Sequence, residues 1–191
     1  APWYSAPIAT DDEEALYKTQ DSRSLVVDSV MADLQYACDY MQEGSSRTRV
    51  TRYAALGYMA RIALHEGTFR KYHEEISELA GTVNSFLEKA VWATDEIMSS
   101  GQFEITGKGA AAYRDLFTNP DLSKNKEMIL FSDYDKDLNR KNNTSTVLNW
   151  QWNLSRSLAD RYLKSDGTPI TEADRTKTFV AMFTDRDPRM A

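Results

Sequence analysis

Apolar residues recur at spacings of three and four through three consecutive stretches between residues 22 and 101, and this pattern restricts the fold more than any other feature of the chain. Such spacing is typical of amphipathic α-helices. The first stretch has Ser22 or Ser24 as a candidate N-cap and ends near Gly44. Its apolar positions are Val27, Val30, Leu34, Ala37, Cys38 and Met41.

A second helix is predicted to begin around residues 48–51 and to end at Gly67, a candidate C-cap. Small residues dominate its middle, so a neighbouring helix can approach closely. The predicted stripe is Val50, Tyr53, Ala54, Gly57, Ala60, Arg61 and Leu64.

A third helix is predicted over residues 84–99, because its apolar positions share one face and Ser99-Ser100-Gly101 follows as a stop. That face consists of Phe86, Leu87, Ala90, Val91, Thr94, Ile97 and Met98.

Beyond Gly101 the periodic segments become short, and Asp-Gly in residues 164–170 indicates a turn. Thr171 is a candidate cap for a last helix. The predicted segments are one or two helical turns in residues 111–117, a short buried strand or extended run in 127–135, a short helix in 156–163 and a last helix within 171–183.

The fold class expected from these segments is all-α, mainly helical with irregular loops and short extended segments. Three regions are predicted: an irregular N-terminal loop (1–20), a helical region (21–101) and a loop-rich region (102–191) that continues beyond the chain end in the full protein. Leu56-Gly57 and Ala90 follow the pattern of tetratricopeptide helix pairs, whose period is about 34 residues, if residues 68–84 are an insertion. Because such a pair cannot bury both faces alone, stacking partners are expected outside these residues.

Composition restricts the partners. The net charge of −6 would repel nucleic acid and anionic lipid surfaces. The single cysteine, Cys38, excludes an internal disulfide and is expected to be a small buried apolar residue. There is no run of roughly 18 apolar residues and no signal peptide. The opening "APWY" lacks Met, so a processed or excised piece is expected.

Sequence motifs give no support for an enzyme, and neither a cofactor nor a metal is predicted. "HEGTF" begins like a zinc-protease motif, but Phe69 stands where the second histidine must be, so His65 is interpreted as a helix-end residue. Asp133, Asp135 and Asp137 have the spacing that opens an EF-hand loop.

That loop departs from the EF-hand pattern at two positions. Leu138 replaces the required Gly, and Thr144 replaces the bidentate Glu. A solvated acidic loop is favoured, with a calcium site of another type as the alternative.

The best candidate for ligand binding is "NWQWN". In an extended segment Trp150 and Trp152 would project from one face roughly 7 Å apart, a spacing suited to stacking on sugar rings, while Asn149 and Asn153 bond hydroxyl groups. The alternative, which is slightly favoured because large aromatics are more often buried, places both indoles in the core. Trp3 and Tyr4 in the N-terminal loop present a weaker case of the same choice.

Six segments, in this order, resemble the middle of SusD/RagB family proteins, and together they cover most of the chain after about residue 20. The segments are "DSRSLVVDSVMADLQYA", "RVTRYAALGYMARIALHEGTFRKYH", "FLEKAVWATDEIMSSGQFEI", "AYRDLF", "SRSLADRYLKSDGTPI" and "FTDRDPRM". Within them Ala54-Ala55 and Ala60-Arg61 look like helix-packing positions, and "SDGTPI" looks like a turn that anchors a core-facing Ile170.

The resemblance implies a tetratricopeptide-like, α-solenoid-like body in an outer-membrane lipoprotein of Bacteroidetes. It implies no catalysis, and capture of glycans at the cell surface for a SusC-like TonB-dependent transporter. The lipidated cysteine, the first helices and the C-terminal region of that family are missing from this chain, so membrane contact would run only through the missing anchor. Two alternatives remain: a helical-repeat scaffold that binds protein, and a glycoside hydrolase.

Overall fold

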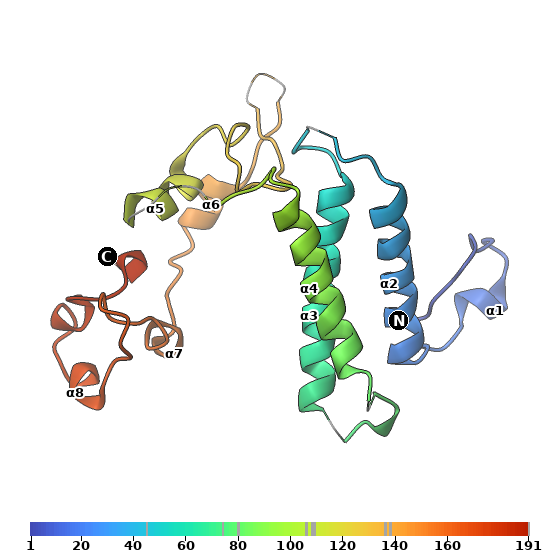
Figure 1. The fold of residues 1–191 in the computed structure, drawn as a ribbon, viewed down its shortest axis with the longest axis horizontal. Helices are drawn as coiled ribbons and strands as arrows, with labels where there is room; N and C mark the ends of the chain where they lie inside the picture. The colour runs from blue at the N-terminus through green and yellow to red at the C-terminus, as the bar shows by residue number, and fades with distance from the viewer. Residues whose placement is uncertain are drawn as a thin grey trace. The chain divides into compact units, whose positions relative to one another are not determined.

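The chain is mainly helical, as predicted, and half of its residues lie in helices. The computed structural model describes residues 1–44, 46–73, 75–79, 81–105, 107, 110–135, 137 and 139–190, and these contain no β-strand (Figure 1). The chain divides into two compact units. The first unit comprises residues 1–105 and 126–132, and the second comprises residues 106–125 and 133–191.

Long and short helices build the first unit. They are α1 (Glu13–Leu16), α2 (Arg23–Tyr40), α3 (Arg52–Tyr72), the 3-10 helix η1 (Ser77–Leu79) and α4 (Val83–Ser99). Of the two predicted N-cap candidates, Ser22 caps α2, since its hydroxyl accepts a hydrogen bond from the Leu25 amide at 3.2 Å. In Figure 1, α3 packs against both α2 and α4, so it is the central helix of this unit.

The core of the first unit lies where these three helices meet. Leu56 and Met59 of α3 are fully buried there, beside Ala93 of α4. Cys38 of α2 is buried, as predicted, and this burial raises the pKa of its thiol. The Arg52 side chain joins α3 to the end of α2 by donating to the Cys38 carbonyl at 2.9 Å.

The prediction that Gly67 ends the second helix is wrong, because α3 continues to Tyr72. Gly67 is buried where α3 crosses α4, and a Cβ on it would come within 2.7 Å of the Leu87 side chain and 3.3 Å of the Leu87 backbone nitrogen. This glycine therefore permits close helix packing. His65 consequently lies inside α3, not at its end, and residues 68–72 belong to the helix instead of an insertion.

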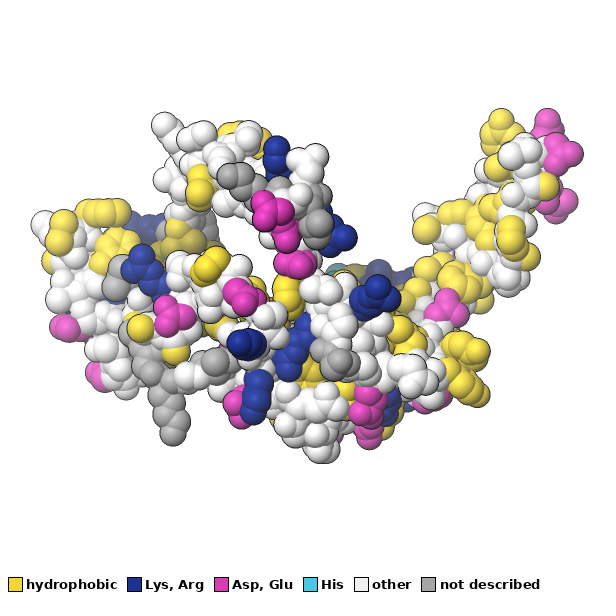
Figure 2. All heavy atoms as spheres, turned by 90° about the horizontal axis from the view of Figure 1, so that it is seen from above, with side chains coloured by type: hydrophobic (Ala, Val, Ile, Leu, Met, Phe, Trp, Pro, Cys, Tyr) yellow, Lys and Arg dark blue, Asp and Glu magenta, His cyan; other side chains and the backbone are white. Residues whose placement is uncertain are grey.

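The predicted apolar stripes are only partly correct. Ala54 and Ala55 are buried as expected, but the buried face of α3 continues through Met59 and Ala63, and Arg61 is exposed. Four apolar residues assigned to the packed faces are instead more than half exposed: Val50, Leu64, Val91 and Met98. Exposed hydrophobic side chains appear between the charged ones in Figure 2. Parts of the helical surface are therefore uncovered in this chain.

Short elements build the second unit. They are α5 (Ala110–Thr118), α6 (Thr144–Leu148), α7 (Arg156–Ala159), α8 (Glu172–Arg175) and the 3-10 helices η2 (Ala181–Phe183) and η3 (Pro188–Met190). The helix expected in residues 111–117 is present as α5, and the one expected in 156–163 is limited to α7, residues 156–159. The last predicted helix is reduced to one turn, α8, and to η2.

Two local predictions in the second unit are confirmed. Thr171 caps α8 in a reciprocal capping box with Asp174. Gly167 has φ +82°, and its amide donates to the Lys164 carbonyl at 2.9 Å, so the Asp-Gly sequence forms the expected turn. For residues 127–135 the sequence predicts a short buried strand or an extended run. No strand forms there, and the segment is irregular and half-buried at Met128 to Phe131.

Candidate functional site

The two tryptophans of "NWQWN" lie on the surface of the second unit. Trp150 is 57% exposed and Trp152 is 70% exposed. Their ring centroids are 6.0 Å apart and their planes are inclined by 41°. The interpretation that both indoles belong to the core is therefore wrong for this chain. Both indoles lie on the surface.

The end of α6 positions the pair. This helix stops after Leu148, and Asn149 is its C-cap, with its amide hydrogen-bonded to the carbonyls of Thr146 and Val147. The chain then continues without regular structure, and the Trp152 indole turns back to donate from Nε1 to the Val147 carbonyl at 2.9 Å. This hydrogen bond fixes the edge of one ring and leaves its faces available for contact.

The two asparagines flanking the tryptophans are also exposed. The side chain of Asn153 donates from Nδ2 to the Gln151 carbonyl at 3.1 Å, which holds its amide close to the segment. Exposed aromatic faces beside amide donors and acceptors suit a ligand that has both an apolar face and hydroxyl groups. A pyranose ring has this character.

Trp3 and Tyr4 belong to the first unit and are only half-buried, so they form a separate feature. The backbone amide of Trp3 donates to Asp21 at 2.7 Å, and Lys18 bridges the Trp3 carbonyl and Asp21. The Lys18 hydrogen bond, together with the Trp3 amide, lowers the pKa of Asp21. The Tyr4 hydroxyl donates to the Ala15 carbonyl. These contacts tie the N-terminal segment to α1 and to the start of α2.

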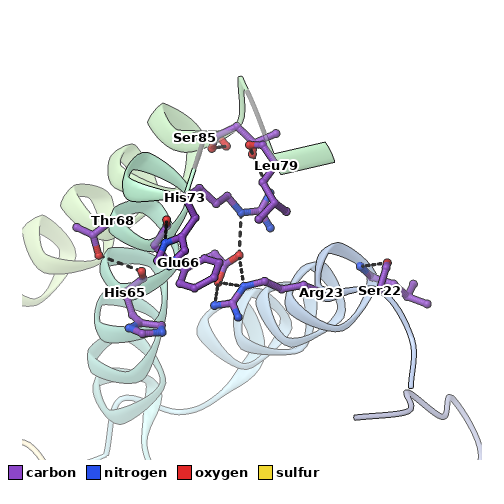
Figure 3. A network of polar contacts seen from close by, with 12 residues as sticks. Ser22, Arg23, His65, Glu66, Thr68, His73, Leu79 and Ser85 are labelled. Carbon is purple, nitrogen blue, oxygen red and sulfur yellow. Dashed lines mark hydrogen bonds and ion pairs between the residues drawn. The ribbon is translucent and has the colours of Figure 1, made fainter. Parts of the chain in front are cut away.

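A buried ionic network in the first unit was not predicted from the sequence (Figure 3). Glu66 of α3 is 1% exposed and accepts hydrogen bonds from Arg23 of α2 at 2.7 Å and from Arg70 at 2.8 Å. Arg70 in turn donates to Thr82, just before α4, at 2.7 Å. The Glu66 carboxylate thus joins α2 to α3, and Arg70 extends the network to the start of α4. The spacing of Glu66 and Arg70, four residues apart, was the only available sequence signal.

The protonation of Glu66 reflects two opposing influences. Burial by itself raises the pKa of this carboxyl group, but the hydrogen bonds and charges of Arg23 and Arg70 outweigh it, and the pKa lies below its usual range. Glu66 is therefore ionised at neutral pH and is unsuited to act as a proton donor.

Aromatic rings enclose the two arginines of the network. The Arg23 guanidinium lies 3.7 Å from the Phe69 ring centroid, and Phe69 stacks on His73 at 4.0 Å. Arg70 lies 4.3 Å from the Phe86 ring centroid. Apart from the buried Nη2 of Arg70, which has no hydrogen-bond partner among the described residues, the polar groups and ring faces of this network contact one another, so its role is to hold the helices together.

The acidic loop shows no metal-binding geometry in the part that the structure describes, where no group of three or more His, Cys, Asp or Glu side chains lies close enough to hold an ion. The Asp135 side chain accepts from the Asp137 amide at 2.7 Å, and the Asp135 carbonyl accepts from the Arg140 amide at 2.8 Å. Leu138, which interrupts the EF-hand pattern, lies outside the described residues.

No protein-family model matches the chain, and no curated protein or solved structure matches it. Among the helices that the structure describes, none combines the length and the apolar composition that a bilayer-spanning segment needs. A function has to be inferred from the side chains themselves, and the exposed tryptophan pair offers the clearest binding chemistry.

Proposed function

We propose that this chain is the glycan-binding, non-catalytic component of an outer-membrane uptake system, and that Trp150 and Trp152 form its sugar-stacking surface. One observation carries the proposal: two indoles, 57% and 70% exposed, lie with their centroids 6.0 Å apart. Exposing two large aromatic side chains forfeits the burial that normally stabilises them. A stacked ligand restores that burial.

The resemblance to SusD/RagB proteins supports the choice of a sugar over other planar ligands. In this proposal the helices of the first unit are a tetratricopeptide-like part of a larger α-solenoid body. The bound oligosaccharide passes to a SusC-like TonB-dependent transporter at the surface of the outer membrane. The all-α architecture is compatible with that assignment.

Alanine substitutions test the tryptophan surface. A glycan array on the unaltered chain identifies the oligosaccharide, and isothermal titration calorimetry then compares Trp150→Ala and Trp152→Ala. Each should weaken binding by about 1 to 3 kcal/mol, the range for stacking of a planar ligand on an aromatic ring. Tyr17→Ala is the matched control, because Tyr17 is an aromatic residue 83% exposed in the other unit. The Tyr17→Ala variant should bind the oligosaccharide with the same affinity as the unaltered chain.

Two outcomes would contradict this assignment. Unchanged affinity in both tryptophan variants with an intact circular-dichroism spectrum would remove the pair from the binding site. Release of reducing sugar from the bound glycan by the purified chain would replace a binding protein with a hydrolase.

A further inference from the structure

A polar pocket of about 300 Å³ lies within the second unit, between the turn that follows α7, the end of α8 and the segment that begins with η2. Its charged lining residues are Lys164, Lys177 and Arg186, together with Asp174 and Asp185. Three cations against two carboxylates leave one excess positive charge. The chain as a whole has a net charge of −6, so this pocket is a local positive region in a negatively charged protein.

Asp174 holds two ammonium groups side by side in the pocket. Its Oδ1 lies 2.6 Å from Lys177 Nζ, and its Oδ2 lies 2.9 Å from Lys164 Nζ. The hydrogen bond from Lys177, followed by those from the Thr171 amide and from Lys164, holds the pKa of Asp174 far below its usual range. The carboxylate is therefore ionised, and it compensates only one of the two ammonium charges.

Both ammonium groups keep donors for a further partner. A lysine ammonium has three N–H donors. Within the described part of the chain, Asp174 is the one partner of Lys164 and of Lys177, and both lysine side chains are partly exposed. An acceptor that enters the pocket can therefore reach donors of both lysines.

Arg186 gives a second, independent indication of an anion. Its Nη atoms donate to the carbonyls of Ala159 at 2.6 Å, Tyr162 at 3.0 Å and Met182 at 3.2 Å, which are neutral acceptors. Its buried Nε has no hydrogen-bond partner among the described residues, and buried donors without a partner are uncommon in folded proteins. No carboxylate in the described part of the chain pairs with this guanidinium, so its charge is left for a ligand to compensate.

Backbone contacts fix the shape of the pocket. Lys164 and Arg186 form an antiparallel bridge, and beside it the Asp187 amide donates to the Leu163 carbonyl at 3.0 Å. The three carbonyl contacts of Arg186 hold its side chain in place. Because the lining is ordered before a ligand binds, little conformational entropy is lost on binding.

The charge and the neutral lining residues restrict the ligand. One excess positive charge matches a monoanion, whereas a dianion would add an uncompensated negative charge near Asp174 and Asp185. The neutral lining consists of the apolar Ala181 and Met182 and the hydroxyl-bearing Thr184. A volume near the lower end of the range for ligand sites, about 300 Å³, admits a molecule the size of one sugar ring.

We propose that this pocket binds the carboxylate of a small hydroxylated molecule, either a uronic acid unit of a glycan or a free hydroxy acid. Lys164 and Lys177 contact the carboxylate, and Arg186 contributes its positive charge. The site uses none of the residues of the tryptophan surface, so it does not depend on the glycan-binding function proposed for Trp150 and Trp152.

NMR titration of the 191-residue chain at constant ionic strength tests the site. Amide shifts of Thr184 and Asp185 should change and saturate with sodium glucuronate and should stay unchanged with glucose, which lacks the charge. Sodium sulfate, a dianion, should bind more weakly than glucuronate. Sodium lactate separates the two sources: weaker binding than glucuronate identifies a uronic acid unit, and equal or tighter binding identifies a free hydroxy acid.

Four variants examine the charge and the shape of the pocket. Lys177→Gln should weaken glucuronate binding about three- to fivefold. Ala181→Leu fills the pocket without changing its charge and should weaken binding about tenfold. Asp185→Asn raises the excess positive charge, and asparagine tolerates the φ of +56° at this position, so binding should tighten about threefold. Lys124→Gln, at an exposed lysine of the same unit outside the lining, is the matched control and should bind like the unaltered chain.

The amide spectrum of each variant shows whether the second unit is folded, and only folded variants are compared. Absence of saturable shifts with both glucuronate and lactate would overturn the proposal, as would tighter binding of sulfate than of either carboxylate. Full binding by folded Ala181→Leu would place the ligand outside the pocket. An equal loss of affinity in Lys124→Gln and Lys177→Gln would reduce the effect to general attraction between charges, which also rejects the site.

Discussion

The two units of this chain are stabilised by different kinds of contact. In the first unit three long helices bury Leu56, Met59 and Ala63 completely, and burial of apolar surface supplies their stability. In the second unit, among the residues described, only Leu116 and Asp174 are buried, and the α-helices are four to nine residues long. Helices that short are marginal by themselves, so contacts other than a core must hold them.

Polar contacts take the place of a core in the second unit. Asp174 accepts from the Thr171 hydroxyl and pairs with Lys177 at 2.6 Å and Lys164 at 2.9 Å. Arg186 donates to the carbonyl of Ala159 at 2.6 Å, which ties the end of α7 to the segment after η2. Lys164 and Lys177 are themselves partly exposed, so solvent screens their ion pairs with Asp174 and each pair contributes little. The second unit is therefore expected to tolerate single substitutions better than the first.

The largest difference between the units is expected at their ion pairs. Glu66→Gln removes the charge that compensates Arg70, which is only 4% exposed, and should destabilise the chain by about 3 to 5 kcal/mol. Glu172→Gln in the second unit breaks an exposed pair with Arg175 and should cost at most about 1 kcal/mol. Urea denaturation followed by circular dichroism measures both. Equal costs would show that the buried network does not stabilise the helices.

A smaller contrast should separate buried from exposed leucines. Leu56→Ala empties a fully buried position and should cost about 3 kcal/mol. Leu158→Ala, at a residue 48% exposed in α7, should cost less than about 1 kcal/mol. The same denaturation experiment applies. A large fall in the free energy of unfolding for Leu158→Ala would mean that the second unit buries this side chain more deeply than the structure shows.

The smallest expected change in stability comes from Asp187 of the second unit and should appear only at acidic pH. The hydrogen bond from the Arg189 side chain, with the Arg189 amide, lowers the pKa of Asp187 from 3.8 to about 2. Because the folded pKa lies below the unfolded value, the stabilisation is complete above about pH 4 and is lost as the pH falls toward 2. Arg189→Ala should return the midpoint of an NMR titration of Asp187 toward 3.8. An unchanged midpoint would exclude Arg189 as the cause.

The sequence predicted the helices well where the signal was local. Thr171 was identified as a cap, and Ser22 as one of two candidates with Ser24, because a cap needs only a hydroxyl and the next three residues. The turn at Gly167 was identified from Asp-Gly in the same way. The three long helices followed from periodicity over four or more turns, although their ends were misjudged at Gly67 and at Gly44, since α2 stops at Tyr40.

The candidate site was predicted only as a choice between two interpretations. "NWQWN" indicated either a core or a ligand surface, and the sequence slightly favoured the core. The structure shows both indoles exposed, because α6 ends at Leu148 and Trp152 turns back to the Val147 carbonyl. Whether an aromatic side chain is covered depends on neighbours distant in sequence, which residue type and spacing do not specify.

By itself the sequence determined the helical class and the local caps and turns. Only the tertiary structure decided that Gly67 faces Leu87, and that Glu66 joins Arg23 to Arg70. The physical reason is that periodicity and capping act within one or two turns of a helix, whereas the identity of the packed face depends on which helix lies against it.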